Sequence, residues 1–154
     1  MRMEVLPARL PVEDEQAILR LYALYCHYFN HGEARKWVEL FAPDGSFTRL
    51  NPSATAPGQI ANPAGSTTGH AALMEMALGR REMFRGLVRH QQTDIVLNPG
   101  PGPDRAEGIS YILLTDWRDG PGKIRAVGDC FATFIRASGD WRFQSIELST
   151  LPLG

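Results

Sequence analysis

Residues 87–117 read LVRHQQTDIVLNPGPGPDRAEGISYILLTDW, two largely apolar segments separated by a run of proline and glycine. Proline and glycine at this density form a turn and cannot continue a strand, so the flanking segments predict two paired strands. Short turns follow at 119–122 and 138–140, and the sequence after each is again typical of a strand. The pattern predicts an antiparallel meander of four strands, at 87–97, 105–117, 123–136 and 141–148.

Helical periodicity precedes the meander. A first helix, which ends at Asn30 before the capping residue Gly32, is predicted from apolar side chains at helical spacing, namely Ile18, Leu21, Tyr22, Tyr25 and Phe29. A short helix over 34–41, a strand over 46–50 and a third helix over 70–84 follow. Helices first and a meander after predict one α+β domain over 1–154, with three N-terminal helices packed on one face of a curved antiparallel sheet.

Two segments lack periodicity. Residues 1–12 contain two prolines and predict an extended lead-in, and residues 51–69 consist mostly of Pro, Gly, Ala, Ser, Thr and Asn. A connection of this length is unusual in a domain whose loops typically have about 4–6 residues. The segment 51–69 is therefore predicted to be a long loop and is a candidate lid over a site.

Composition excludes several classes of partner. The 154 residues carry 16 basic and 17 acidic side chains, so the net charge of −1 gives no general attraction to nucleic acid or to an anionic membrane. No apolar run approaches the ~20 residues of a membrane span, and the first residues lack the apolar core of a secretion signal. Cys26 and Cys130 have no metal-type spacing, which suits a reducing compartment, and we expect a cytoplasmic protein.

Five short motifs carry a family resemblance. They are Asn30-His31-Gly32-Glu33, the sequence LFAPDG at 40–45, Thr68-Gly69-His70, RHQQTD at 89–94, and GDWRF at 139–143. In this order and spacing the chain resembles SnoaL-like proteins of the nuclear transport factor two-like superfamily. The resemblance implies a cone-shaped fold around a pocket for a small-molecule ligand, without a cofactor or a metal. Scytalone dehydratase, lindane dehydrochlorinase and ketosteroid isomerase share this fold, so the fold alone leaves the reaction open.

The resemblance also implies catalytic residues. In the dehydratase and dehydrochlorinase branch the strand histidine, matched here by His90, is a general base, and an aspartate at the end of the first helix orients it. A histidine is suited to this role because its usual pKa is close to neutral. This chain has Asn30 at the aspartate position, which accepts a hydrogen bond but carries no charge. Tyr25 is a candidate for positioning substrate, and Asp94, on the same predicted strand face as His90, is a candidate replacement carboxylate.

The remaining polar residues are assigned more ordinary roles. The predicted pocket lining consists of Phe29, Phe47, Gln92, Ser110, Ile112 and Phe134. Asp116 is expected to be a solvated turn carboxylate, and Arg80 is expected to belong to a solvated basic helix end. His27 and His31 have the i, i+4 spacing of metal ligands, but no third ligand is apparent and no metal is predicted.

Three functions remain open at this level. The first is a cofactor-independent lyase, such as a dehydratase, or an isomerase that uses His90 on a small apolar or polycyclic molecule. The second is a non-catalytic small-molecule binding module, and the third is a small structural subunit of a ring-hydroxylating dioxygenase. A homodimer is predicted through the outer sheet face, where alternate residues of one strand are apolar, namely Ile109, Tyr111, Leu113 and Trp117.

Overall fold

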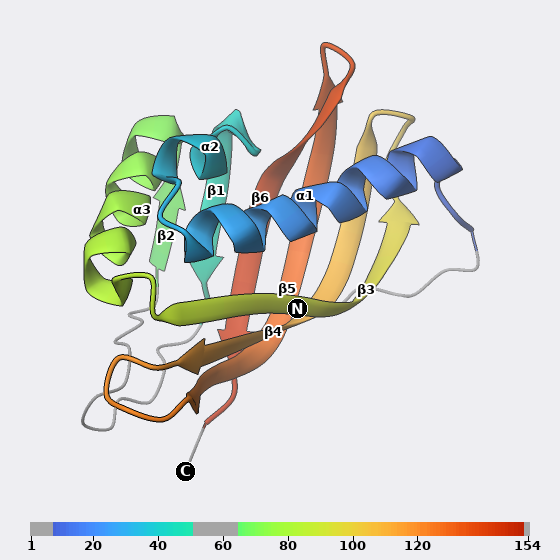
Figure 1. The fold of residues 1–154 in the computed structure, drawn as a ribbon. Helices are drawn as coiled ribbons and strands as arrows, with labels where there is room; N and C mark the ends of the chain where they lie inside the picture. The colour runs from blue at the N-terminus through green and yellow to red at the C-terminus, as the bar shows by residue number, and fades with distance from the viewer. Residues whose placement is uncertain (1–7, 51–64, 153–154) are drawn as a thin grey trace.

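The structure is a computed structural model, and it describes residues 8–50 and 65–152. Its helices are α1 (Val12–Asn30), α2 (Ala34–Val38) and α3 (His70–Phe84). Its strands are β1 (Phe41–Arg49), β2 (Gly65–Thr68), β3 (Val88–Pro99), β4 (Arg105–Asp116), β5 (Lys123–Ala137) and β6 (Asp140–Thr150). The α+β fold class is therefore confirmed (Figure 1).

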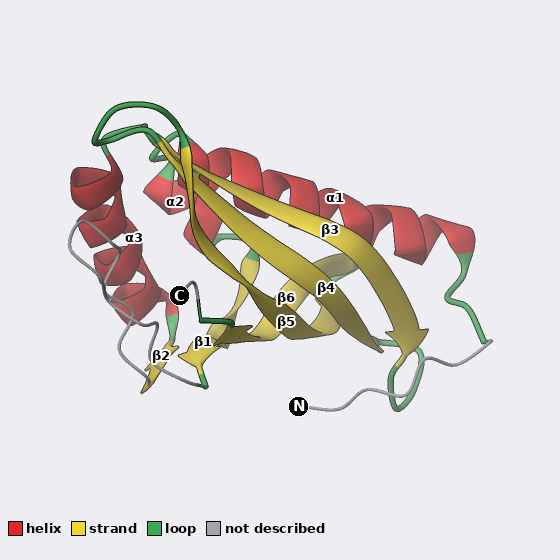
Figure 2. Ribbon diagram, turned by 90° about the horizontal axis from the view of Figure 1, so that it is seen from below, coloured by secondary structure: helices red, strands yellow, loops and turns green. Residues whose placement is uncertain are grey.

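The strands form one sheet in the order β2-β1-β6-β5-β4-β3. The four strands of the meander pair antiparallel with their sequence neighbours, as predicted. β1 lies parallel to β6, with Phe47 opposite Ile146, and so the first strand joins the sheet beside the last. Figures 1 and 2 show that the sheet curves strongly and that all three helices lie on its concave side.

An aromatic core joins the helices to the sheet. The side chains of α1 at Ile18, Tyr22 and Tyr25 are fully buried, as the helical spacing predicts. The ring centroid of Tyr22 lies 5.6 Å from those of Phe134 on β5 and Phe143 on β6. Burying such side chains typically stabilises a fold by about 1.5–3 kcal/mol each, and this packing fixes α1 across the sheet.

The sequence prediction differs from the structure at three elements. α2 ends at Val38, and strand structure begins at Phe41, because the Phe143 backbone N–H on β6 donates to the Leu40 carbonyl at 2.9 Å. Residues 65–68 form β2, so the prediction of a loop throughout 51–69 is wrong for this part. The candidate lid at 51–64 and residues 1–7 of the lead-in lie outside the described residues.

Asp116 also differs from its prediction. The carboxylate of this residue, at the end of β4, is fully buried rather than solvated. It accepts hydrogen bonds from Arg118 Nη2 at 2.9 Å and from Arg125 Nε at 3.0 Å. Burial by itself raises the pKa of Asp116, but the hydrogen bonds from Arg118 and Arg125 outweigh burial and lower it to about 2. Sequence position alone could not show this, because Arg125 comes from the next strand.

Among residues 8–50 and 65–152, no helix is long and apolar enough to cross a bilayer.

Candidate functional site

A largely apolar pocket lies between the helices and the concave face of the sheet. It has an empty volume of about 520 Å³, including solvent space at its mouth. α1 contributes Tyr25 and Phe29, α3 contributes Arg80 and Phe84, and β3 contributes His90. The floor comes from β1, β4, β5 and β6 and consists of Phe47, Arg49, Ile112, Leu114, Ala126, Leu148 and Thr150.

Asn30 and His90 are joined by three hydrogen bonds. The His90 backbone N–H donates to Asn30 Oδ1 at 2.6 Å, and Asn30 Nδ2 donates to the His90 carbonyl at 3.2 Å. These bonds satisfy the outward-facing backbone of β3, which is an edge strand of the sheet. They also fix which end of the amide is oxygen, because Oδ1 must face the backbone donor.

The third bond fixes the histidine tautomer. Asn30 Oδ1 also lies 2.8 Å from His90 Nδ1. An amide oxygen can only accept, so Nδ1 carries the proton and Nε2 keeps its lone pair. No hydrogen bond from the described residues occupies Nε2. His90 lines the pocket, and its Nε2 lone pair is not used by the bonds to Asn30.

Aromatic rings surround the imidazole. The His90 centroid lies 4.7 Å from that of Phe29 and 5.6 Å from that of Phe84, and only 7% of the residue is exposed. This burial, together with the positive charges of Arg80 and Arg49, lowers the pKa of His90 to about 3. At neutral pH the imidazole is therefore uncharged and is a poor proton acceptor in these surroundings.

The depressed pKa of His90 predicts a pH dependence of stability. The folded pKa is about 3 and the unfolded value is about 6.5, so between these limits the unfolded chain binds one more proton. The free energy of unfolding should consequently fall by roughly 1.4 kcal/mol per pH unit as the pH drops below about 6.5. Urea titrations from pH 7 to pH 4 would measure it. The same slope in His90→Gln would contradict the assignment.

Two arginines line the pocket, and the sequence interpretation did not assign either of them to it. Arg49 lies at the end of β1, and Arg80 lies near the end of α3. The sequence pattern could have placed both in the pocket. Arg49 is two residues after Phe47 and so lies on the same strand face, and Arg80 has helical spacing with Leu73 and Ala77. The expectation that Arg80 lies on a solvated helix end is therefore wrong.

The predicted lining residues divide into three groups. Phe29, Phe47 and Ile112 line the pocket, and so does Tyr25, the candidate for positioning substrate. Ser110 Oγ donates a hydrogen bond of 2.6 Å to Gln92 Oε1, and Gln92 lines a second, open groove between α1 and β3, whose wall includes Asn30 and also His90. Phe134 packs in the core and does not line the pocket, because Tyr22 covers it at 5.6 Å.

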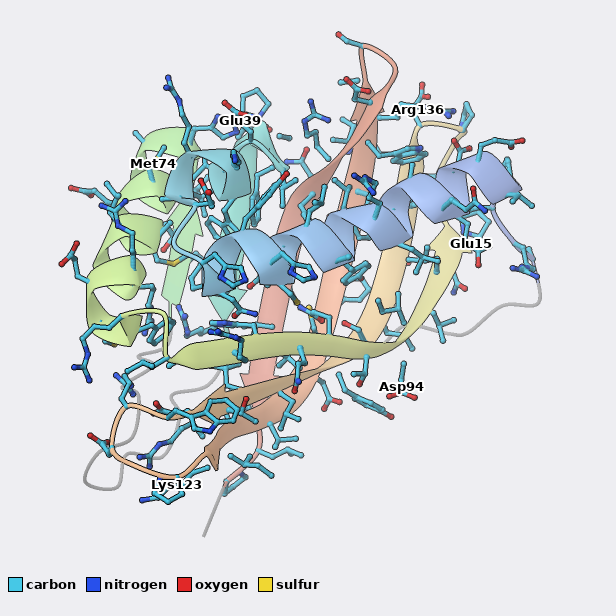
Figure 3. All side chains as sticks on the ribbon, in the orientation of Figure 1. Glu15, Glu39, Met74, Asp94, Lys123 and Arg136 are labelled. Atoms are coloured by element: carbon cyan, nitrogen blue, oxygen red, sulfur yellow. The ribbon has the colours of Figure 1, made fainter. Side chains whose placement is uncertain are left out.

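Asp94 does not face the pocket. Between Thr93 and Val96 the pairing of β3 with β4 shifts by one residue, which is a β-bulge. Asp94 lies at this bulge with a positive φ of 54° and is exposed (Figure 3). The bulge breaks the alternation on which the prediction depended, so the proposed replacement carboxylate is wrong.

The two histidines with i, i+4 spacing lie beside each other at the surface of α1 and its C-terminal end. The rings of His27 and His31 stack with centroids 6.3 Å apart, and both residues are exposed. Within the part of the chain that the structure describes, no three His, Cys, Asp or Glu side chains are grouped to hold a metal ion.

A family model describes the relatives of this chain. The model of the SnoaL-like domain matches residues 11–147, nearly the whole sequence. This chain is a member of the SnoaL-like family. The resemblance and the pocket-forming architecture predicted from the motifs are thereby confirmed. A comparison with curated proteins finds no match.

Solved structures show the same fold at low sequence identity. The protein Rv3472 from Mycobacterium tuberculosis, of unknown function, is 24% identical with a TM-score of 0.77, covering 93% of this chain and 79% of its own. An NTF2-like protein with a cystatin-like fold from Novosphingobium aromaticivorans is 19% identical with a TM-score of 0.77, covering 93% and 85%. A scytalone dehydratase-like protein from the same organism is 22% identical with a TM-score of 0.70, covering 93% and 95%.

Proposed function

We propose that this SnoaL-like pocket is the active site of a cofactor-free lyase or isomerase. His90 Nε2 removes a proton from a small, largely apolar substrate. The observation that carries the proposal is the pair of His90 and Asn30, which holds the imidazole as a neutral tautomer with Nε2 unprotonated, at a residue that lines the pocket.

The proposed reaction consists of proton transfers and needs no cofactor. Nε2 takes a proton from a carbon next to a carbonyl group, and the electron pair of that C–H bond moves onto the carbonyl to give an enolate. In an isomerase the imidazolium returns the proton to another carbon. In a dehydratase the enolate electrons re-form the carbonyl and make a C=C bond to the next carbon, and the hydroxyl group on that carbon leaves, takes the proton from the imidazolium and departs as water.

Asn30 limits the strength of this base. A family aspartate would place a negative charge beside the imidazolium, whereas the amide of Asn30 offers only a dipole at 2.8 Å. The aromatic wall and the nearby guanidinium groups further disfavour the imidazolium. These features favour the second candidate, a pocket that binds a small molecule without turnover.

Hydrogen exchange separates these two functions. In D₂O, 1-tetralone and cyclohexanone, each with and without a carboxylate substituent, would be incubated with the protein and followed by NMR. Proton abstraction predicts deuterium uptake next to the carbonyl group, faster than in buffer. Binding of any of these ketones without such uptake would support a binding module instead.

We also propose a homodimer through the outer sheet face. Tyr111 is 56% exposed and Ile124 is 55% exposed there, while Leu113 between them is half-buried. An apolar patch of this kind is costly in water and is covered when two copies pair. Light scattering at micromolar concentration should give twice the chain mass, and Tyr111→Glu should give the monomer mass. The exposed helix variant Glu82→Lys is the control, and a monomeric wild-type protein would contradict the proposal.

A further inference from the structure

Two guanidinium groups lie in the wall of the apolar pocket. Arg49 reaches it from β1 and Arg80 reaches it from α3, so the two charges approach from the sheet and from the helix layer. The Arg49 Cζ atom lies 4.7 Å from the centroid of Phe47, and the Arg80 Cζ atom lies 5.8 Å from that of Phe84. An aromatic side chain thus lies beside each guanidinium group.

The two charges oppose one another in this environment. Burial, followed by the positive charge of Arg80, lowers the pKa of Arg49 to about 10. Burial also lowers the pKa of Arg80. Placing two like charges in a partly desolvated pocket is costly, so an anion between them would be stabilised by both.

Three other largely buried arginines of the described residues have a carboxylate partner. Arg118 and Arg125 share Asp116 at 2.9 and 3.0 Å, and Arg136 lies 2.7 Å from Asp14. No carboxylate of residues 8–50 and 65–152 lies within ion-pair distance of Arg49.

From this arrangement we propose that the pocket takes a ligand with a carboxylate group, which binds Arg49 and Arg80 while its apolar ring lies against Phe29, Ile112 and Leu148. A planar guanidinium group matches a carboxylate with two parallel hydrogen bonds.

A bound carboxylate also changes the basicity of His90, and this consequence rests on the proposed function. Arg80 and Arg49 are the two charges that lower the pKa of His90 after burial. A bound anion cancels their effect, so it raises the pKa of His90 and makes Nε2 a better proton acceptor. The substrate itself would therefore activate the base, which compensates for the uncharged Asn30.

Matched pairs of small molecules test the proposal by binding alone. Benzoate with benzamide, and 2-naphthoate with 2-naphthamide, would be titrated into the full chain at pH 7 by NMR and calorimetry. Each carboxylate should bind at least about 10-fold more tightly than its amide, since ionic hydrogen bonds contribute about 1.5–3 kcal/mol. Benzoate should also raise the pKa of His90, measured from the imidazole ¹⁵N shifts.

Variants identify the arginines as the cause. Arg49→Met and Arg80→Met should each remove most of the carboxylate preference and leave amide binding unchanged. Arg81→Met, on the same helix but exposed, is the matched control and should change neither. If a pocket variant fails to fold, the comparison of carboxylate with amide binding in the wild-type chain still tests whether the pocket prefers an anion.

Three results would overturn the inference: equal affinity for carboxylate and amide, a preference that survives both arginine substitutions, or no binding of any of the four compounds at millimolar concentration. Failure of the proposed reaction would look different. Tight carboxylate binding without deuterium exchange would retain the anion site and refute the lyase or isomerase, whereas exchange into neutral ketones alone would do the reverse.

Discussion

His90→Ala should lower turnover by about 10²–10⁴-fold, the usual contribution of a general base. Among the described residues no other histidine lines the pocket, so no neighbouring imidazole there can replace Nε2. The substitution removes the ring but keeps the backbone of residue 90, whose N–H and carbonyl hold Asn30 at 2.6 and 3.2 Å. The edge of β3 should therefore stay in place, and ligand binding should be mostly retained.

The assay for His90→Ala is the initial rate of deuterium uptake by whichever ketone the wild-type chain exchanges, with circular dichroism to verify folding. Asn30→Asp is the companion variant and should raise this rate, because a carboxylate stabilises the imidazolium in the transition state. A rate unchanged in His90→Ala would exclude His90 as the base. If Asn30→Asp only weakens the binding of neutral ligands, a charge has been added to a pocket that merely binds.

Asp116→Ala should lower the free energy of unfolding by about 3–5 kcal/mol, the range found when one partner of a buried ion pair is removed. The Asp116 side chain is fully buried, and the side chains of Arg118 and Arg125 are only 13% and 10% exposed. The substitution leaves two largely buried guanidinium groups without their common carboxylate. It also removes the acceptor at 2.9 Å from the Arg118 backbone N–H.

Urea unfolding at pH 7 measures this loss. Asp119→Ala is the matched control, since Asp119 is 57% exposed and contacts Arg125 at 3.4 Å. An exposed ion pair typically contributes less than about 1 kcal/mol. Similar losses in the two variants would show that Asp116 does not hold the ends of β4 and β5 together.

The elements of this protein were largely predictable because their signals are local. The apolar stripe of α1, the span of α3 and the turns of the meander each depend on spacing within one segment of chain. Comparison with the motifs of one family then indicated His90 and Asn30, and these two residues do meet. The pairing of β1 with β6 joins segments about a hundred residues apart, and no local pattern encodes it.

The site depended on distances between elements. Arg49 and Arg80 are 31 positions apart and come from a strand and a helix, so only the packing of α3 over β1 places both charges in one pocket. Asp94 is exposed because a single-residue bulge interrupts the alternation of β3. Asp116 is paired because Arg125 of β5 lies beside it. The sequence by itself determined the order of helices and strands and the presence of a candidate base. Only the tertiary structure decided which charges surround that base, because burial and proximity, which set its pKa, arise when the layers pack.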